Sequence, residues 1–255
     1  MKILLANKFY YRRGGDCIYT LNLEEGLKAH GHDVAVFAMQ HPENLPTPWG
    51  KYFPSEVTFK LSSNLLETLV RPYGLGEVKR NFNKLLDDFC PDVVHANNIH
   101  SQLSPVIMEL AKKRGIQTVW TLHDYKLVCP RYDCRKDKSV CELCFSDKTR
   151  SRHKALKNCI KNKCIKNSII GSLIGYGESL CWSPDRLQNV TNAFICPSRF
   201  LADKLEGSGL FPSKMHVLHN FIDAGKCRMN AFGKDDYYCY AGRLAEEKGV
   251  KTLIE

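Results

Sequence analysis

Short apolar runs alternate with longer amphipathic stretches along most of the chain. Each run is nearly continuous in apolar residues, which is typical of a strand covered on both faces of a sheet. The stretches between them carry apolar residues at helical spacing. Strands separated by such helices indicate a parallel sheet with helices on both faces, an α/β fold. The pattern predicts strands at 2–6, 32–38, 91–96, 116–122, 192–198 and 214–220, and helices at 17–31, 76–89, 102–115 and 199–209.

The pattern changes late in the chain, which indicates two domains. Residues 220–236 are polar, contain glycine and have weak periodicity, as in a connection between domains. An apolar run at 237–241 then predicts a new strand, and a helical pattern opens at Glu246. We therefore expect one α/β domain at 1–225, and a linker with the first strand and helix of a second domain at 226–255. Because that second domain would stop after one unit, we expect the chain to be a fragment.

The composition is that of an ordinary globular protein, with 44% hydrophobic and 25% charged residues among 255. The sequence has no run of about 18 apolar residues that would span a membrane, and its start predicts a buried strand rather than a signal peptide. We therefore expect a cytoplasmic protein whose twelve cysteines are mostly reduced. The formal net charge of +10 favours anionic partners such as nucleotide phosphates or anionic lipid. We expect no nucleic-acid partner, because no recognition helix or RNA-binding motif is present.

Polar residues and glycines follow several predicted strands, at the edge where a parallel sheet binds its ligands. Gly14 and Gly15 precede the first predicted helix, where free backbone N–H groups favour an anion, although a plain flexible turn has the same pattern. Asn97 follows the third predicted strand as a candidate ligand donor, whereas we interpret Asn98 as a cap of the next helix. His123 ends the fourth predicted strand and is placed to donate to a substrate hydroxyl or to act as acid or base.

Six cysteines lie between residues 129 and 164, in a region with little apolar periodicity. Cys141 and Cys144 form a C-x-x-C pair, the paired spacing that zinc prefers in structural sites. A metal could supply the core that this region otherwise lacks, since metal binding contributes directly to folding. Disulfides and free thiols explain the same residues, and the sequence leaves these alternatives open.

The end of the same region is strongly basic. Eight lysines and arginines lie between Lys148 and Lys166, and acidic residues are nearly absent. A solvated basic face is the default interpretation, and attraction to anionic lipid is the functional alternative. The second interpretation would place the protein at the inner face of the cell membrane.

Two cations stand close together in the last stretch of the chain. Gly242 and Arg243 follow the strand predicted at 237–241, and Lys248 lies about one turn into the predicted helix. A guanidinium and an ammonium beside a helix start favour binding of a diphosphate. Such cations would also stabilise a departing nucleotide diphosphate.

The stretch "AGRLAEEKGVKTLIE" at 241–255 closely resembles the G-R-L-x-x-E-K-G signature that opens the second domain of family-four retaining glycosyltransferases. The paired glycines, "TLHD" at 121–124, "CPSRF" at 196–200 and "LHNFID" at 218–223 also fall in that family's order, so the resemblance spans the chain. It implies a GT-B fold, in which two Rossmann-like domains face each other across a cleft. The first domain would hold mainly the acceptor, and the second, here truncated, the nucleotide-sugar donor.

The resemblance also implies roles for single residues. The glycine pair would lie near the donor phosphates and sugar, and His123 would contact the transferred sugar as a catalytic residue. Asn97, from its place at a strand end, is a further candidate donor-binding residue. Arg243 and Lys248 would bind the donor diphosphate and stabilise its departure. The implied reaction transfers a sugar with retention of configuration and needs no catalytic metal.

The cysteine spacing resembles one bacterial branch of the same family, with "CELC" after "HDYKLVCP". This resemblance favours four of the six cysteines as ligands of one structural zinc within an insertion at about 129–164. The four are Cys129, Cys141, Cys144 and Cys164.

The family's glutamate-bearing motif, which lies later in the second domain, is absent from this chain. The sequence therefore leaves two functions open. One is a glycosyltransferase of polysaccharide or glycolipid synthesis in the cell envelope, acting on a glycan or lipid-linked acceptor. The other is a non-catalytic acceptor-binding module of such an enzyme. Donor turnover would distinguish the two.

Overall fold

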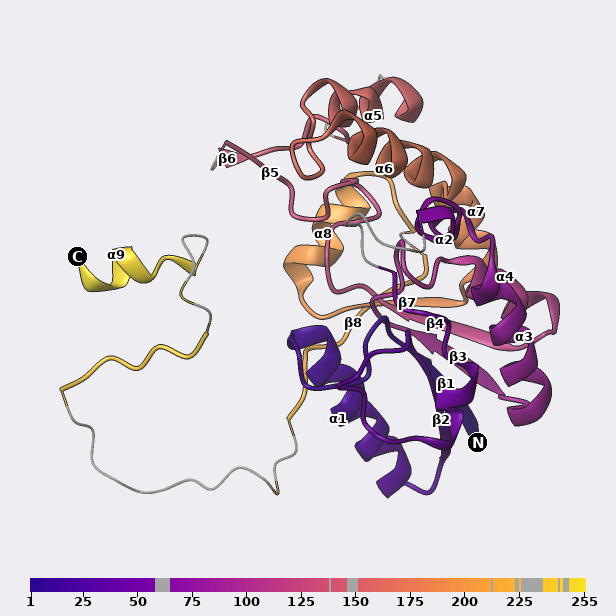
Figure 1. Cartoon of the computed structure of the whole chain (residues 1–255). Helices are drawn as coiled ribbons and strands as arrows, with labels where there is room; N and C mark the ends of the chain where they lie inside the picture. The colour runs from indigo at the N-terminus through magenta and orange to yellow at the C-terminus, as the bar shows by residue number, and fades with distance from the viewer. Residues whose placement is uncertain are drawn as a thin grey trace. The chain divides into compact units, whose positions relative to one another are not determined.

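The chain divides into two units, Met1–Ile222 and Asp223–Glu255, in the computed structural model (Figure 1). Unit one contains the sheet, the main hydrophobic core and the candidate site. The structure describes residues 1–57, 65–137, 139–145, 151–211, 213–222, 225, 236–242, 244 and 248–255.

Six parallel strands form the central sheet, in the order β2-β1-β3-β4-β7-β8. β1 pairs with β2 on one side and with β3 on the other, so the strand order reverses direction at β1. Ligands of such sheets bind outside the carboxyl ends of the strands at this reversal. The strands are β1 (Lys2–Ala6), β2 (Asp33–Phe37), β3 (Val93–Ala96), β4 (Gln117–Thr121), β7 (Ala193–Cys196) and β8 (Met215–Val217).

Helices connect the strands and turn their apolar sides toward the sheet. In α3 (Glu77–Phe89), Val78 and Phe82 are fully buried, and their spacing of four places them on one side of the helix. α1 (Gly15–Ala29) lies against one face of the sheet, and α3 and α4 (Val106–Lys113) lie on the other (Figure 1). The predicted Rossmann-like α/β fold is therefore confirmed. Other helices of this unit are η1 (Pro48–Tyr52), α2 (Leu65–Val70), η2 (Arg71–Tyr73), α5 (Arg152–Lys161), α6 (Ile169–Cys181), α7 (Pro184–Val190) and α8 (Arg199–Gly207).

Helix α4 begins later than the sequence pattern predicted. The pattern placed a helix start at Gln102, but α4 starts at Val106. Ser104 has a positive φ of 64° and precedes Pro105, and the residue before a proline is disfavoured in the helical conformation. Residues 97–104 therefore form a loop at the carboxyl end of β3 rather than part of a helix.

The cysteine-rich region forms a hairpin and a helix pair. The strands β5 (Arg135–Lys136) and β6 (Ser139–Val140) pair antiparallel, and α5 packs along α6 (Figure 1). Cys144, Leu156 and Cys159 form a small buried cluster that is separate from the main core. The region thus has a core of its own, built partly from thiols.

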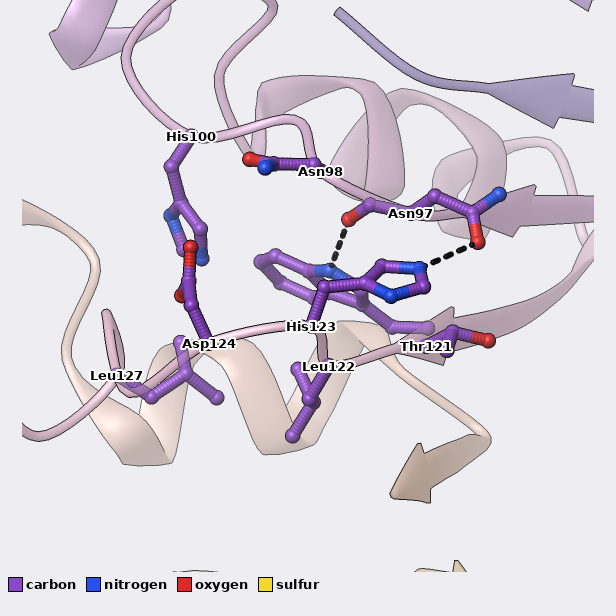
Figure 2. Close-up of a pocket in the computed structure, with 9 residues that line it drawn as sticks. Asn97, Asn98, His100, Thr121, Leu122, His123, Asp124 and Leu127 are labelled. Atoms are coloured by element: carbon purple, nitrogen blue, oxygen red, sulfur yellow. Dashed lines mark hydrogen bonds between the residues drawn. The ribbon is translucent and has the colours of Figure 1, made fainter. Parts of the chain in front are cut away.

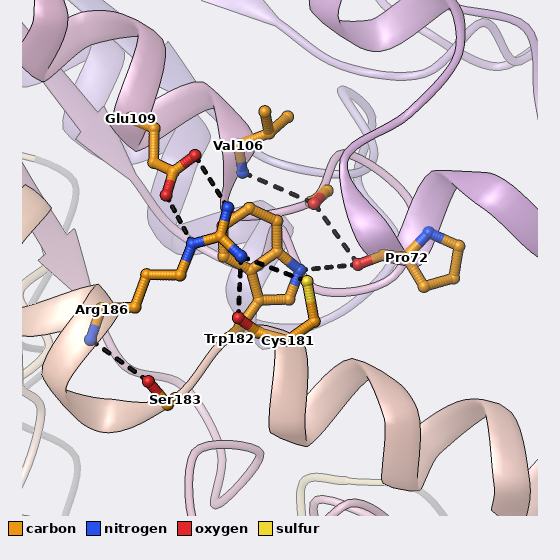
Figure 3. Close-up of polar contacts among 8 residues, drawn as sticks. Pro72, Val106, Glu109, Cys181, Trp182, Ser183 and Arg186 are labelled. Atoms are coloured by element: carbon orange, nitrogen blue, oxygen red, sulfur yellow. Dashed lines mark hydrogen bonds and ion pairs between the residues drawn. The ribbon is translucent and has the colours of Figure 1, made fainter.

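The carboxyl end of α6 is fastened to the rest of the first unit by an indole and a guanidinium (Figure 3). The Trp182 indole N–H donates to the Pro72 carbonyl oxygen at 2.7 Å. The Arg186 guanidinium of α7 lies 4.0 Å from the centroid of the Trp182 ring. It also donates two hydrogen bonds, of 2.6 and 3.0 Å, to the Glu109 carboxylate in α4. A bidentate pair of this kind holds two groups in one relative orientation, so α4, α7 and the end of α6 are joined.

The prediction of a strand at 237–241, in the second unit, is wrong. These residues, which the structure describes, lie in no strand. A helix does follow, but α9 (Val250–Ile254) begins after Gly249, whose φ is +65°. The predicted start at Glu246 lies outside the described residues. The assignment of 226–255 to a donor-binding domain stays a prediction.

Candidate functional site

The loops after β3 and β4 bring two predicted site residues into contact. Asn97 follows β3 directly, and His123 follows β4 after one residue. The His123 Nε2 lies 3.1 Å from the Asn97 Oδ1 (Figure 2). Because an amide oxygen only accepts, Nε2 donates in this contact and Nδ1 is left as the acceptor of the neutral ring.

The His123 imidazole is kept neutral by its surroundings. Burial lowers the pKa of His123 to about 4; Asp16 acts against this shift and Lys8 adds to it. The edge of the Tyr19 ring, from α1, lies against the imidazole, with 5.0 Å between the ring centroids. A neutral imidazole between an amide and an aromatic ring suits a hydrogen bond to a hydroxyl better than an ion pair with a phosphate.

Asn97 is buried, with 1% of its surface exposed, and its backbone and side chain differ in how well they are satisfied. Its carbonyl oxygen accepts a hydrogen bond of 2.9 Å from the Trp120 indole. Among the described residues, however, its Nδ2 has no hydrogen-bond partner. Because a buried donor without a partner costs about 1–3 kcal/mol, the Asn97 side-chain amide is incompletely satisfied in the described structure.

Asn7 and Asp16, which sequence reasoning missed, also contact the residues of this site. The Asn98 backbone N–H donates to the Asn7 Oδ1 at 3.0 Å, and the Asn98 Nδ2 donates to the Asp16 Oδ2 at 3.0 Å. The interpretation of Asn98 as a helix cap is therefore wrong, because α4 starts several residues later and Asn98 reaches across to α1 instead. Asn7 directly follows β1, so the strand-end rule would have found it. Asp16 carries no such signal.

The glycine pair marks the start of α1, as predicted. Gly14 is the residue that precedes the helix, its backbone is extended, and as a glycine it has no side chain of its own to cap the first turn. A Cβ added at Gly15 would meet no atom within 4 Å, so there is open space beside it. Asp16 of the same turn is hydrogen-bonded to Asn98, which links the turn to the loop after β3. The structure thus brings the glycine pair to the same edge as Asn97 and His123, and anion binding there stays a prediction.

A buried ion pair holds the surrounding loops in place. The Lys126 Nζ lies 2.9 Å from the Glu178 Oε2, and the two side chains are 9% and 4% exposed. The Ser101 hydroxyl lies 2.9 Å from each oxygen of the same carboxylate. The Lys126 backbone N–H donates to the Asp124 Oδ1 at 2.9 Å, and burial raises the pKa of Asp124. Glu178, on α6, therefore ties together the loops after β3 and β4, which no sequence pattern indicated.

These loops line a small pocket whose residues are mostly polar, with Trp120, Leu122 and Leu127 as its apolar part (Figure 2). Its polar side chains could orient a ligand by hydrogen bonds. The pocket is lined by Asn97, Asn98, His100, Trp120, Thr121, Leu122, His123, Asp124 and Leu127.

The predicted zinc ligands lie in one region but do not form a ligand shell. Burial raises the pKa of Cys144 to about 12, which keeps that thiol protonated. Cys129 is hydrogen-bonded to the Cys134 thiol, and this contact lowers the pKa of Cys129 to about 6. Cys164 is hydrogen-bonded to the Cys159 thiol. In the described part of the chain, no group of three or more His, Cys, Asp or Glu side chains is arranged to hold a metal ion. Zinc binding by Cys129, Cys141, Cys144 and Cys164 stays a prediction that requires these thiols to turn toward one centre and lose their protons.

Arg243 and Lys248, the two predicted diphosphate ligands, are not among the described residues of the first unit. Arg243 lies outside the described residues, and Lys248 belongs to the second unit, just before α9. Their role stays a prediction. None of the helices described is long and apolar enough to cross a bilayer.

Comparison with known proteins gives one family match and several similar chains. Residues 13–160 match the model described as "Glycosyltransferase Family 4". A curated relative from Klebsiella pneumoniae, "Uncharacterized 42.6 kDa protein in cps region", is 26% identical over 273 residues. The match covers all of this chain and 64% of that relative, so the chain spans less than two thirds of its length.

Solved structures that match this chain share little sequence with it. Sucrose-phosphate synthase from Thermosynechococcus elongatus is 14% identical with a TM-score of 0.47, covering 86% of this chain and 47% of that one. The catalytic domain of starch synthase IV from Arabidopsis thaliana is 13% identical with a TM-score of 0.44, covering 88% and 52%. The chain thus spans about half the length of these structures.

Proposed function

The chain belongs to glycosyltransferase family 4, and from this premise we propose that it transfers a sugar from a nucleotide-sugar donor to a glycan or lipid-linked acceptor, with retention of configuration. The observation that supports this proposal most directly is the neutral His123 bound to Asn97 at the carboxyl edge of the sheet. Both residues lie within the stretch that matches the family, 13–160.

The proposed role of His123 follows from its charge. Positive charge develops on the sugar ring as a glycosidic bond breaks, and a protonated imidazole beside the ring would oppose it. A neutral imidazole instead accepts a hydrogen bond from a sugar hydroxyl through Nδ1. The unpaired Nδ2 of Asn97 donates to a second sugar oxygen. Hydrogen bonds that strengthen in the transition state lower the barrier.

The donor diphosphate is proposed to bind without a catalytic metal. The amino end of α1, after Gly14 and Gly15, favours an anion. Arg243 and Lys248 would supply the cations that a departing diphosphate needs. In this proposal, backbone N–H groups, a guanidinium and an ammonium balance the negative charge of the diphosphate.

The proposed pathway is the synthesis of a cell-envelope polysaccharide or glycolipid. The description of the curated relative as a protein "in cps region" supports this choice. The proposed location is cytoplasmic, where nucleotide-sugars serve as donors.

Transfer of label from nucleotide-sugars tests the proposal. The chain is incubated with a panel of labelled donors and with glycan or lipid extracts as acceptors, and label in the acceptor is counted. His123→Ala should lower turnover per folded molecule roughly tenfold to a thousandfold, with a moderate drop in melting temperature because the Asn97 Oδ1 loses its partner. His216→Ala is the matched control, because that histidine is exposed on β8.

The outcomes separate the two candidate functions. Transfer with the anomeric configuration retained in the product, shown by NMR, supports the proposed reaction. Acceptor binding with no transfer from any donor would instead identify a non-catalytic acceptor-binding module. Equal rates for wild type and His123→Ala, with transfer present, would remove His123 from the catalytic residues.

A further inference from the structure

The buried side of helix α6 consists of small and polar residues. Its buried residues are Ser172, Gly175, Glu178 and Ser179, which lie on one side at helical spacing. A Cβ added at Gly175 would lie 2.2 Å from a side-chain carbon of Ile165, so this side is tightly packed. A helix on the surface of a globular protein normally buries its large apolar residues. α6 reverses this pattern, because its buried side is small and polar.

The exposed side of α6 carries large apolar residues at its amino end. Ile169, Ile170 and Leu173 are 52%, 70% and 47% exposed. Ser168 caps the helix by accepting a hydrogen bond of 3.2 Å from the Gly171 N–H, so the first turn is well defined. Exposed apolar residues that cluster on one surface mark an interaction site.

Basic residues accompany this apolar end. Lys154, Lys157 and Lys161 on α5, and Lys163 in the connection to α6, are all exposed. No Asp or Glu occurs from residue 148 to residue 177. Because α5 packs along α6 (Figure 1), the ammonium groups and the apolar side chains belong to one part of the molecule.

We propose that the amino end of α6 and the exposed lysines of α5 form a docking surface for an anionic lipid bilayer. The apolar side chains of α6 enter the boundary between head groups and acyl chains, and the lysines contact anionic head groups. A second copy of this chain would present the same positive charge and be repelled, whereas an anionic bilayer complements both features. The Trp182 and Arg186 contacts hold the far end of α6 to η2 and α4 (Figure 3), so the docking surface is fixed to the first unit.

Vesicle flotation tests the proposal without any sugar donor, so its result does not depend on the proposed glycosyl transfer. The full chain is mixed with vesicles of phosphatidylcholine alone or of phosphatidylcholine with phosphatidylglycerol. We expect binding to the anionic vesicles only, and we expect added salt to weaken it because ions screen the lysines. Equal binding to both vesicles, or binding to neither, overturns the proposal.

Paired variants assign the binding to the proposed surface. Lys157→Glu with Lys161→Glu should lower the bound fraction at least about tenfold. The matched control reverses the same number of charges on α3, with Lys79→Glu and Lys84→Glu, which are also exposed. Equal losses in both double variants would show that only net charge matters and would overturn the assignment.

The apolar contribution is tested in the same way. Ile170→Ser with Leu173→Ser should reduce binding about tenfold or more, with an unchanged melting temperature because both side chains are exposed. Leu75→Ser with Phe200→Ser is the matched control, since these residues are 57% and 66% exposed elsewhere. A dimer seen by light scattering that the α6 variant dissolves would show that a second copy, not lipid, covers this surface.

Discussion

Histidines that the fold keeps neutral make its stability depend on pH. Burial lowers the pKa of His95 and of His123 to about 4, and it lowers the pKa of His100 well below its usual value. His95 is hydrogen-bonded to Thr121 at 2.8 Å, and His123 to Asn97. The unfolded chain exposes the same rings to water, where they protonate near 6.5. Acid therefore favours the unfolded chain.

The size of the effect follows from the difference between the two pKa values. For a histidine whose pKa is about 4 in the fold and 6.5 in the unfolded chain, stability is complete above 6.5 and is lost as the pH falls toward 4. Between pH 7 and pH 5, the free energy of unfolding should fall by about 2 kcal/mol for each such histidine. The effect of Asp124 has the opposite sign, because burial raises its pKa and acid relieves the cost of its charge.

Urea unfolding of wild type and one variant isolates the contribution of His123. His123→Gln keeps a polar amide at the position but cannot titrate, so its loss of stability between pH 7 and pH 5 should be smaller by about 2 kcal/mol. The comparison is made within each protein, which cancels the constant cost of the substitution. His216→Gln is the control, and it should show the pH dependence of wild type.

The same pH dependence in His123→Gln and in wild type would refute this reasoning. It would mean that the imidazole titrates alike in the folded and unfolded chain. The neutral ring on which the proposed contact with the sugar depends would then be absent.

Three further predictions follow from contacts elsewhere. Glu178→Gln leaves the buried Lys126 ammonium without its carboxylate and should lower the free energy of unfolding by about 3 kcal/mol. Asp87→Asn breaks the exposed ion pair with Arg114 and should lower it by less than about 1 kcal/mol. Urea unfolding of both variants measures the difference. Gly74→Ala should lower the melting temperature more than Gly31→Ala, because both residues have positive φ but only at Gly74 does an added Cβ meet side chains, the nearest at 2.8 Å. Elemental analysis of protein purified without added metal should find about one zinc per chain if the four predicted thiolates bind it; disulfides and no metal by mass spectrometry would reject the site.

The sequence by itself determined the six strands of the central sheet and the edge where the candidate site lies. Strands buried on both faces must be apolar, so their positions are visible as short runs. The carboxyl ends of parallel strands meet at one edge, so residues that follow those runs come together. Gly14, Gly15, Asn97 and His123 were found by this rule, and it would have found Asn7.

Contacts between distant segments depended on the tertiary structure. The Asn98 amide reaches Asp16, and Lys126 pairs with Glu178, because the strand order and helix packing place these loops side by side. No sequence pattern predicts either contact, because each partner taken alone is an ordinary polar residue. Residues 237–241, which the structure describes, lie in no strand although their apolar pattern predicted one.

Helix α6 shows most clearly what only the tertiary structure decided. Its sequence is rich in apolar residues all round, and the sequence pattern predicted neither the helix nor which side faces water. The ion pair of Glu178 with Lys126 and the Trp182 contact turn its polar side inward. Ile169, Ile170 and Leu173 are exposed as a result, because a rigid helix that buries one side must present the other.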